Sequence, residues 1–281
     1  MNNLKIFNSI FYRMFTTSRN RIIRTQYLDL LGLYIPMDFP SENYQKIFIR
    51  FLEMLKDSGY DKVTYFEFVN SWISVADRFS SMTFADYEFS KQREKYGVIP
   101  PNPRAREIQD TALFSFFINS QSFIESLSYS IYILASLKNQ QNFPLKYDDL
   151  ERIHPELVSD KLNCYFPSAQ LSLELKTLTN SKEYAEMKMI RNTLIHRTRG
   201  PPRRRSFTRM KLKGFGEVDI PLDSWIIEGK IKETVGGVKR PIDHRVDLSS
   251  ITSKNREWTL KNTTRLLESM RIFILNDSVA L

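Results

Sequence analysis

Apolar residues recur every three or four positions along most of this chain. One stripe begins at Tyr44 and ends at Leu55, and a long one begins at Leu113 and ends at Leu134. Such spacing places apolar side chains on one face of an α-helix. It predicts five helices, over 41–55, 64–96, 107–137, 180–195 and 253–275. The pattern therefore indicates a mainly α protein built as a helical bundle.

Prolines interrupt the helical pattern in two places. Pro100, Pro101 and Pro103 lie close together, and proline rings disfavour helix both at their own position and at the preceding residue. We therefore expect a linker at 97–104 that separates an N-terminal helical region, 1–100, from a helical domain at 101–281. The second interruption, 138–167, predicts a connecting loop with at most short helical turns.

Residues 207–248 do not follow the helical pattern. Short runs of β-forming residues, such as 218–222 and 230–235, alternate with glycines. This alternation is typical of short strands joined by turns. We expect a small β-hairpin insertion between the last two helices.

Composition narrows the setting and the partners. The chain has 281 residues and 41 lysines and arginines against 32 acids, which gives a net charge of +9. This excess favours a polyanionic partner, although a merely basic protein would have the same composition. The single cysteine, Cys164, indicates a reducing, cytoplasmic setting, and the polar residues within 112–137 argue against a membrane span. The basic, acid-free stretch 1–28 fits an arm, a first helix or an organellar transit peptide.

One stretch combines residues suited to RNA cleavage. Arg191, Asn192 and His196 lie at the end of the helix predicted over 180–195. An imidazole can accept or donate a proton near neutral pH, and a guanidinium offers several donors to phosphate oxygens. Asn192 could orient the phosphate or the imidazole. If the helix ends near Ile195, the histidine ring can return alongside the arginine.

The run Arg191-Asn192-x-x-x-His196 resembles the R-N-x-x-x-H form of the motif of HEPN (higher eukaryotes and prokaryotes nucleotide-binding) domains. The resemblance covers roughly residues 105–276 and implies a HEPN-like helical bundle that forms a homodimer. It also implies a metal-independent endoribonuclease, as in toxin–antitoxin and phage-defence systems, with an antitoxin or defence-system partner. Residues 1–100 and 207–248 have no counterpart in a minimal HEPN domain.

A run of cations follows the motif. Residues 191–213 include nine cations and no acid. We expect the cations after the motif to bind the backbone of single-stranded RNA, although a solvated loop is the alternative. The expected RNA-binding residues are Arg197, Arg199, Arg203, Arg204, Arg205, Arg209, Lys211 and Lys213.

These observations predict an enzyme that cuts RNA through 2′-hydroxyl attack and leaves a 2′,3′-cyclic phosphate, with no cofactor and no metal. His154 and His244 lack the spacing of a metal site, and the acidic patch of Asp148, Asp149 and Glu151 is more typical of a solvated surface than of metal binding. One alternative is a catalytically silent HEPN module that binds RNA or a partner protein. Another is a basic nucleic-acid-binding protein unrelated to this family, in which Arg191 and His196 are ordinary surface residues.

Overall fold

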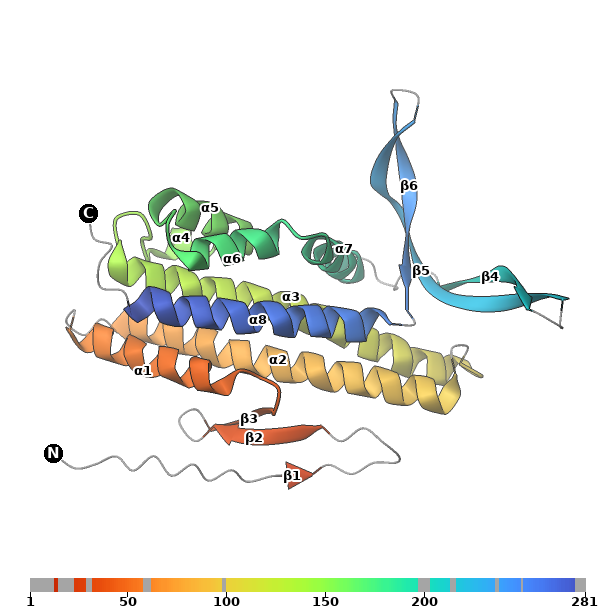
Figure 1. Ribbon diagram of the computed structural model, residues 1–281, viewed down its shortest axis with the longest axis horizontal. Coiled ribbons are helices and arrows are strands. Elements are labelled where there is room, and N and C mark those ends of the chain that lie inside the picture. Colours follow the sequence, from red (N-terminus) through yellow and green to blue (C-terminus); the bar gives the residue numbers. More distant parts are fainter. Residues whose placement is uncertain are drawn as a thin grey trace.

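The computed structural model describes residues 13–14, 23–28, 32–57, 62–97, 100–196, 203–212, 216–235, 238–248 and 250–275 (Figure 1). The structure describes only the backbone, and not the side chains, of residues 13–14, of residue 196 and of the described residues between 203 and 247. Most of the described chain is helical, which confirms the predicted mainly α fold with a small β insertion.

Four long helices run alongside one another (Figure 1). They are α1 (Ser41–Asp57), α2 (Lys62–Tyr96), α3 (Pro103–Lys138) and α8 (Ile251–Leu275). Shorter helices cover α3 and α8 on the side away from the N-terminus. These are α4 (Tyr147–Leu150), α5 (Pro155–Tyr165), α6 (Gln170–Thr179) and α7 (Lys182–His196).

Aromatic rings fill the contact between α1 and α2. Phe51 and Phe68 stack with their ring centroids 3.8 Å apart, and Tyr44 and Trp72 stack at 4.4 Å with nearly parallel planes. Phe68 also lies 5.2 Å from Trp72, which makes the four rings one continuous stack. The spacing that predicted the helices therefore places their largest side chains in the core.

The proline cluster at 100–103 forms the turn of a helical hairpin. Oδ1 of Asn102 accepts a hydrogen bond of 2.9 Å from the backbone N–H of Ala105, and Pro103 occupies the first turn of α3. An asparagine cap followed by proline is a favourable helix start. Buried residues on both sides of this turn belong to one hydrophobic core. The division into an N-terminal region, 1–100, and a helical domain, 101–281, stays a prediction.

The N-terminal part contains a small antiparallel sheet that the helical pattern did not predict. Its strands are β1 (Arg13–Met14), β2 (Arg24–Leu28) and β3 (Leu33–Pro36). Gly32 adopts a φ of 67° in the β2–β3 turn and donates its N–H to the carbonyl of Leu28. Leu28 and Ile35 are buried against the core, so this sheet closes one side of α2.

The second sheet forms an arm that projects from the bundle where α7 ends and α8 begins (Figure 1). It consists of β4 (Arg203–Leu212), β5 (Gly216–Val235) and β6 (Val238–Asp247). β4 pairs with residues 216–225 of β5, whereas β6 pairs with residues 224–235. The arm is thus two successive two-stranded ribbons that share β5. It begins at Arg203, four residues before the insertion predicted at 207–248.

The prediction of a connecting loop at 138–167 was wrong for α5. His154 caps this helix, because its ring Nδ1 accepts a 3.3 Å hydrogen bond from the N–H of Leu157, and Pro155 follows in the first turn. Val158 and Leu162 are buried with helical spacing. The prolines that suggested a loop therefore mark the start of a helix, which is the other position where proline is tolerated.

Candidate functional site

Helix α7 positions the predicted motif. Tyr184, Met187, Ile190 and Leu194 are all buried, as the spacing predicted, and the helix packs on α3. Oγ of Ser181 accepts a 3.2 Å hydrogen bond from the N–H of Tyr184, so the helix is capped one residue after the predicted Asn180. The buried face fixes the rotation of α7 about its axis.

Arg191 and Asn192 interact directly. Nη1 of Arg191 donates a 3.1 Å hydrogen bond to Oδ1 of Asn192, and Nη2 lies 3.8 Å from Oε2 of Glu125 on α3. The arginine side chain is 27% exposed, so part of the guanidinium remains accessible to a ligand. Its Nε is buried and has no hydrogen-bond partner within the described residues.

Glu125 was not predicted as part of the site. It is the one acid between Thr111 and Leu137, a stretch that otherwise forms the most apolar helix of the chain. A lone charge in such a segment needs a partner, and this signal could have indicated an ion pair with a cation elsewhere. Here the carboxylate holds the motif arginine against α3.

His196 is the last residue of α7, and its ring lies outside the part of the chain whose side chains are described. Five residues of continuous α-helix turn the backbone by about 140° beyond a full circle. Position 196 is therefore well around the helix from Arg191. Convergence of the two side chains stays a prediction, and the continuous helix makes convergence within a single copy harder than a helix ending before His196 would.

The predicted RNA-binding cations fall into two groups. Arg197, Arg199 and Lys213 lie outside the described residues. The remaining five lie in β4, where three are paired in register with acids of β5: Arg205 with Asp223, Arg209 with Asp219, and Lys211 with Glu217. Arg203 and Arg204 are paired with Trp225 and Ser224. Three of the five cations in β4 therefore have an acid as the cross-strand neighbour in the register.

A second ion pair joins α7 to α5. Lys188 Nζ donates a hydrogen bond to Oε1 of Glu156, and Nδ1 of His154 lies 3.1 Å from Oε2 of the same carboxylate. Burial raises the pKa of Glu156, but hydrogen bonds from Lys188 and from the residue's own backbone, together with the nearby His154 ring, outweigh burial and lower the pKa to about 2. Lys188 precedes Arg191 by three residues, so both cations share one side of α7.

Carboxylates from two different helices therefore hold this side of α7 at consecutive turns. No sequence pattern linked Glu156 with Lys188, which are 32 residues apart. The arrangement fixes where Arg191 and Asn192 lie. It also leaves a cationic surface whose charges are partly balanced by protein carboxylates.

Comparison with models of protein families, with curated proteins and with solved structures finds no match to this chain. Among the described residues, no group of three or more histidines, cysteines and acids is arranged to hold a metal ion. None of the described helices combines the length and apolarity required to cross a bilayer.

Proposed function

We propose that this protein is a metal-independent endoribonuclease of HEPN type that acts through Arg191, Asn192 and His196. The observation that carries the proposal is the hydrogen bond that joins Arg191 to Asn192 near the end of α7, with Glu125 holding the arginine. A positioned guanidinium with remaining exposure suits an anionic phosphate. The cationic β4 follows α7 in sequence, which supports a polyanionic substrate.

In the proposed reaction the 2′-oxygen of the RNA attacks the adjacent phosphorus, and the bond to the 5′-oxygen breaks. One His196 accepts the proton of the 2′-hydroxyl, and another donates a proton to the departing 5′-oxygen. Arg191 stabilises the negative charge that builds up on the phosphate oxygens. The products are a 2′,3′-cyclic phosphate and a free 5′-hydroxyl.

A homodimer would supply both histidines. A two-fold axis repeats every residue, so a second Arg191 and a second His196 come without any further sequence. The rotation of about 140° between positions 191 and 196 supports this arrangement, because an arginine of one copy could then face a histidine of the other. We further propose a cytoplasmic effector of toxin or phage-defence type, with an antitoxin or another defence protein as its partner.

The direct test is RNA cleavage in EDTA with end-group analysis of the products. We expect cyclic phosphate ends from the wild-type chain and loss of cleavage in His196→Ala. Full activity of His196→Ala would refute the proposed chemistry. Loss of wild-type activity in EDTA would indicate a metal enzyme instead.

The shared site has its own test. Wild-type and His196→Ala subunits are mixed, and the activity of the isolated heterodimer is compared with that of the wild-type dimer. A site that uses both copies of His196 predicts loss of cleavage in this heterodimer, whereas two independent sites would leave part of the activity. A monomer that cleaves at the full rate would exclude a shared site.

The second candidate function is a silent HEPN module that binds RNA or a partner protein. The Arg191–Glu125 pair is the observation in its favour, since an ion pair between helices can serve packing alone. In that case Arg191→Ala lowers thermal stability, and the wild-type protein binds RNA without cutting it. The cleavage assay above separates the two candidates.

A further inference from the structure

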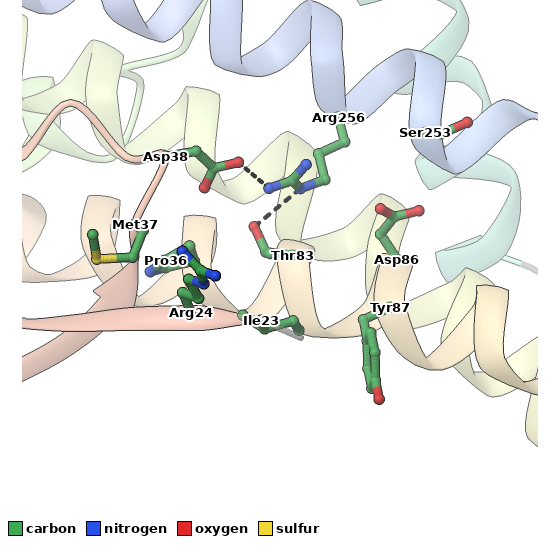
Figure 2. A pocket seen from close by; sticks show the side chains of 10 residues that line it. All are labelled: Ile23, Arg24, Pro36, Met37, Asp38, Thr83, Asp86, Tyr87, Ser253 and Arg256. Atoms are coloured by element: carbon green, nitrogen blue, oxygen red, sulfur yellow. Dashed lines mark hydrogen bonds and ion pairs between the residues drawn. The ribbon is translucent and has the colours of Figure 1, made fainter. Parts of the chain in front are cut away.

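A pocket of about 500 Å³ lies between the β2–β3 hairpin, α2 and the first turns of α8 (Figure 2). This volume is within the range of small-molecule sites. The residues that line it come from three separate parts of the sequence, and four of them are charged: Arg24, Asp38, Asp86 and Arg256.

Two of these charged residues, Arg256 and Asp38, form an ion pair with each other. Nη2 of Arg256 donates a hydrogen bond to Oδ2 of Asp38, and its Nε donates one of 3.4 Å to the hydroxyl of Thr83 (Figure 2). This network ties α8 to α2 and to the segment after β3. It leaves Arg24 and Asp86 as the charges available to a ligand.

Asp86 is the unusual member of the set. Its side chain is buried, with 7% of the residue exposed, and Oδ1 has no hydrogen-bond partner within the described residues. Burial of a carboxylate oxygen without a donor is costly, and native proteins seldom leave one unmatched. In Figure 2 the carboxylate extends from α2 towards α8, on the side of Arg256 and Ser253.

Arg24 provides the opposite charge. It is an exposed residue of β2, and in Figure 2 its side chain lies on the far side of Thr83 from Asp86. A cation and a buried carboxylate thus stand apart across one cavity. The four lining charges sum to zero, so the pocket does not favour a polyanion such as an RNA strand.

We propose that this pocket binds a small zwitterion of the amino-acid type. The ammonium group of the ligand donates hydrogen bonds to Asp86, and its carboxylate accepts them from Arg24. Charge-assisted bonds of this kind are the strong ones, and a forked guanidinium suits a carboxylate. This inference does not rest on the RNA chemistry at α7.

The test screens the common L-amino acids one at a time, with the nucleoside monophosphates as a comparison set, by thermal stabilisation of the full chain and then by calorimetry. At least one amino acid at about 10 mM is expected to raise the melting temperature, because a ligand that binds only the folded state stabilises it. Absence of any response from the amino acids would overturn the proposal. A response confined to the nucleotides would overturn it as well.

The variants locate the site. Asp86→Asn and Arg24→Gln are each expected to weaken binding at least about tenfold, since each removes one charged partner. Asp160→Asn, an exposed acid on α5, is the matched control and should bind normally. Unchanged affinity in both pocket variants would place the ligand elsewhere and refute the assignment.

Stability without ligand gives an independent readout. If Asp86 is kept for a ligand, Asp86→Asn should raise the melting temperature of the free protein, because it removes a buried carboxylate oxygen, Oδ1, that has no donor within the described residues. If Asp86 serves only packing, the variant should melt lower and respond to ligand as the wild type does. That second result would overturn the proposal.

Discussion

Nη2 of Arg191 on α7 lies 3.8 Å from Oε2 of Glu125 on α3, so an ion pair between two helices holds the arginine of the motif. The same guanidinium bonds Asn192 through Nη1. Glu125 therefore sets the direction from which Arg191 can meet a phosphate.

Glu125→Gln should lower RNA cleavage by about tenfold, because the arginine is no longer held in place, which corresponds to about 1.4 kcal/mol in the activation barrier. Its effect on unfolding should stay below about 1 kcal/mol, since the pair is partly exposed. Arg191→Lys should lower the rate of RNA cleavage by about 100-fold, because lysine lacks the planar fork of donors that a guanidinium has. Arg152→Lys, at an exposed arginine, is the control and should leave cleavage unchanged. Full activity of Arg191→Lys would contradict the proposed role.

The register of β4 predicts unequal contributions to RNA binding. Arg203 and Arg204 lie opposite neutral residues of β5, whereas Arg205 and Arg209 lie opposite Asp223 and Asp219. Salt dependence is measured as the slope of the logarithm of the single-stranded RNA affinity against the logarithm of the salt concentration. Replacing Arg203 and Arg204 by Ala should make this slope shallower by about 0.7 for each phosphate contact that is lost. The matched Arg205→Ala and Arg209→Ala double variant should change it less. Equal slopes in both variants and the wild type would mean that β4 does not contact RNA.

Glu156 predicts a pH-dependent loss of stability. Its folded-state pKa of about 2 lies below the ordinary value of 4.5, so the folded chain binds this proton more weakly than the unfolded chain. The lowered pKa of Glu156 therefore adds to the free energy of unfolding. This contribution is complete above about pH 4.5 and is lost as the pH falls towards 2. After allowance for solvent screening it amounts to about 1 kcal/mol.

Thermal unfolding between pH 7 and pH 2 checks this expectation. The wild type should lose about 2–4 °C more than Glu156→Gln over this range. Glu42→Gln, which removes a surface pair with Lys46, serves as the control and should follow the wild type closely. Parallel curves for Glu156→Gln and the wild type would show that the Lys188 contact contributes no stability.

The ring stack between α1 and α2 predicts a large effect of one substitution. Trp72→Ala removes a fully buried indole that stacks on Tyr44 and Phe68, so the free energy of unfolding should fall by about 3–5 kcal/mol. Phe66→Ala, at a 56% exposed position of the same helix, should change it by less than about 0.5 kcal/mol. Urea denaturation measures both. A loss in Trp72→Ala no greater than the control's would be inconsistent with a packed stack.

The long helices could be predicted because their apolar residues repeat with the helical period. All of the residues expected to be buried along α3 are buried, from Leu113 to Leu134. Helix α5 escaped prediction because proline signals both a loop and the first turn of a helix. The β2–β3 hairpin escaped because its buried residues are few, and its packing on α2 depends on a part of the chain distant in sequence.

Of the candidate site, the sequence could predict only residues that lie close together along the chain. Arg191 and Asn192 are adjacent, and the structure joins them. Glu125 and Glu156, which hold α7 from two other helices, follow from the packing of the bundle, which no linear motif encodes. The placement of three β5 acids opposite cations of β4 escaped prediction for the same reason, since the register of a strand pair is known only when both strands are placed.

The arm between α7 and α8 begins with β4 and ends with β6, which lie on opposite sides of β5. Trp225 of β5 is paired with Arg203, the first residue of β4, on one side and with Val246, near the end of β6, on the other. Two strand spacings, about 10 Å, therefore separate the point where the chain departs from the point where it returns. A short peptide could bridge this distance, and loops of different length differ little in closure entropy. A chain without the arm could therefore keep the helical core closed with a short connection in its place.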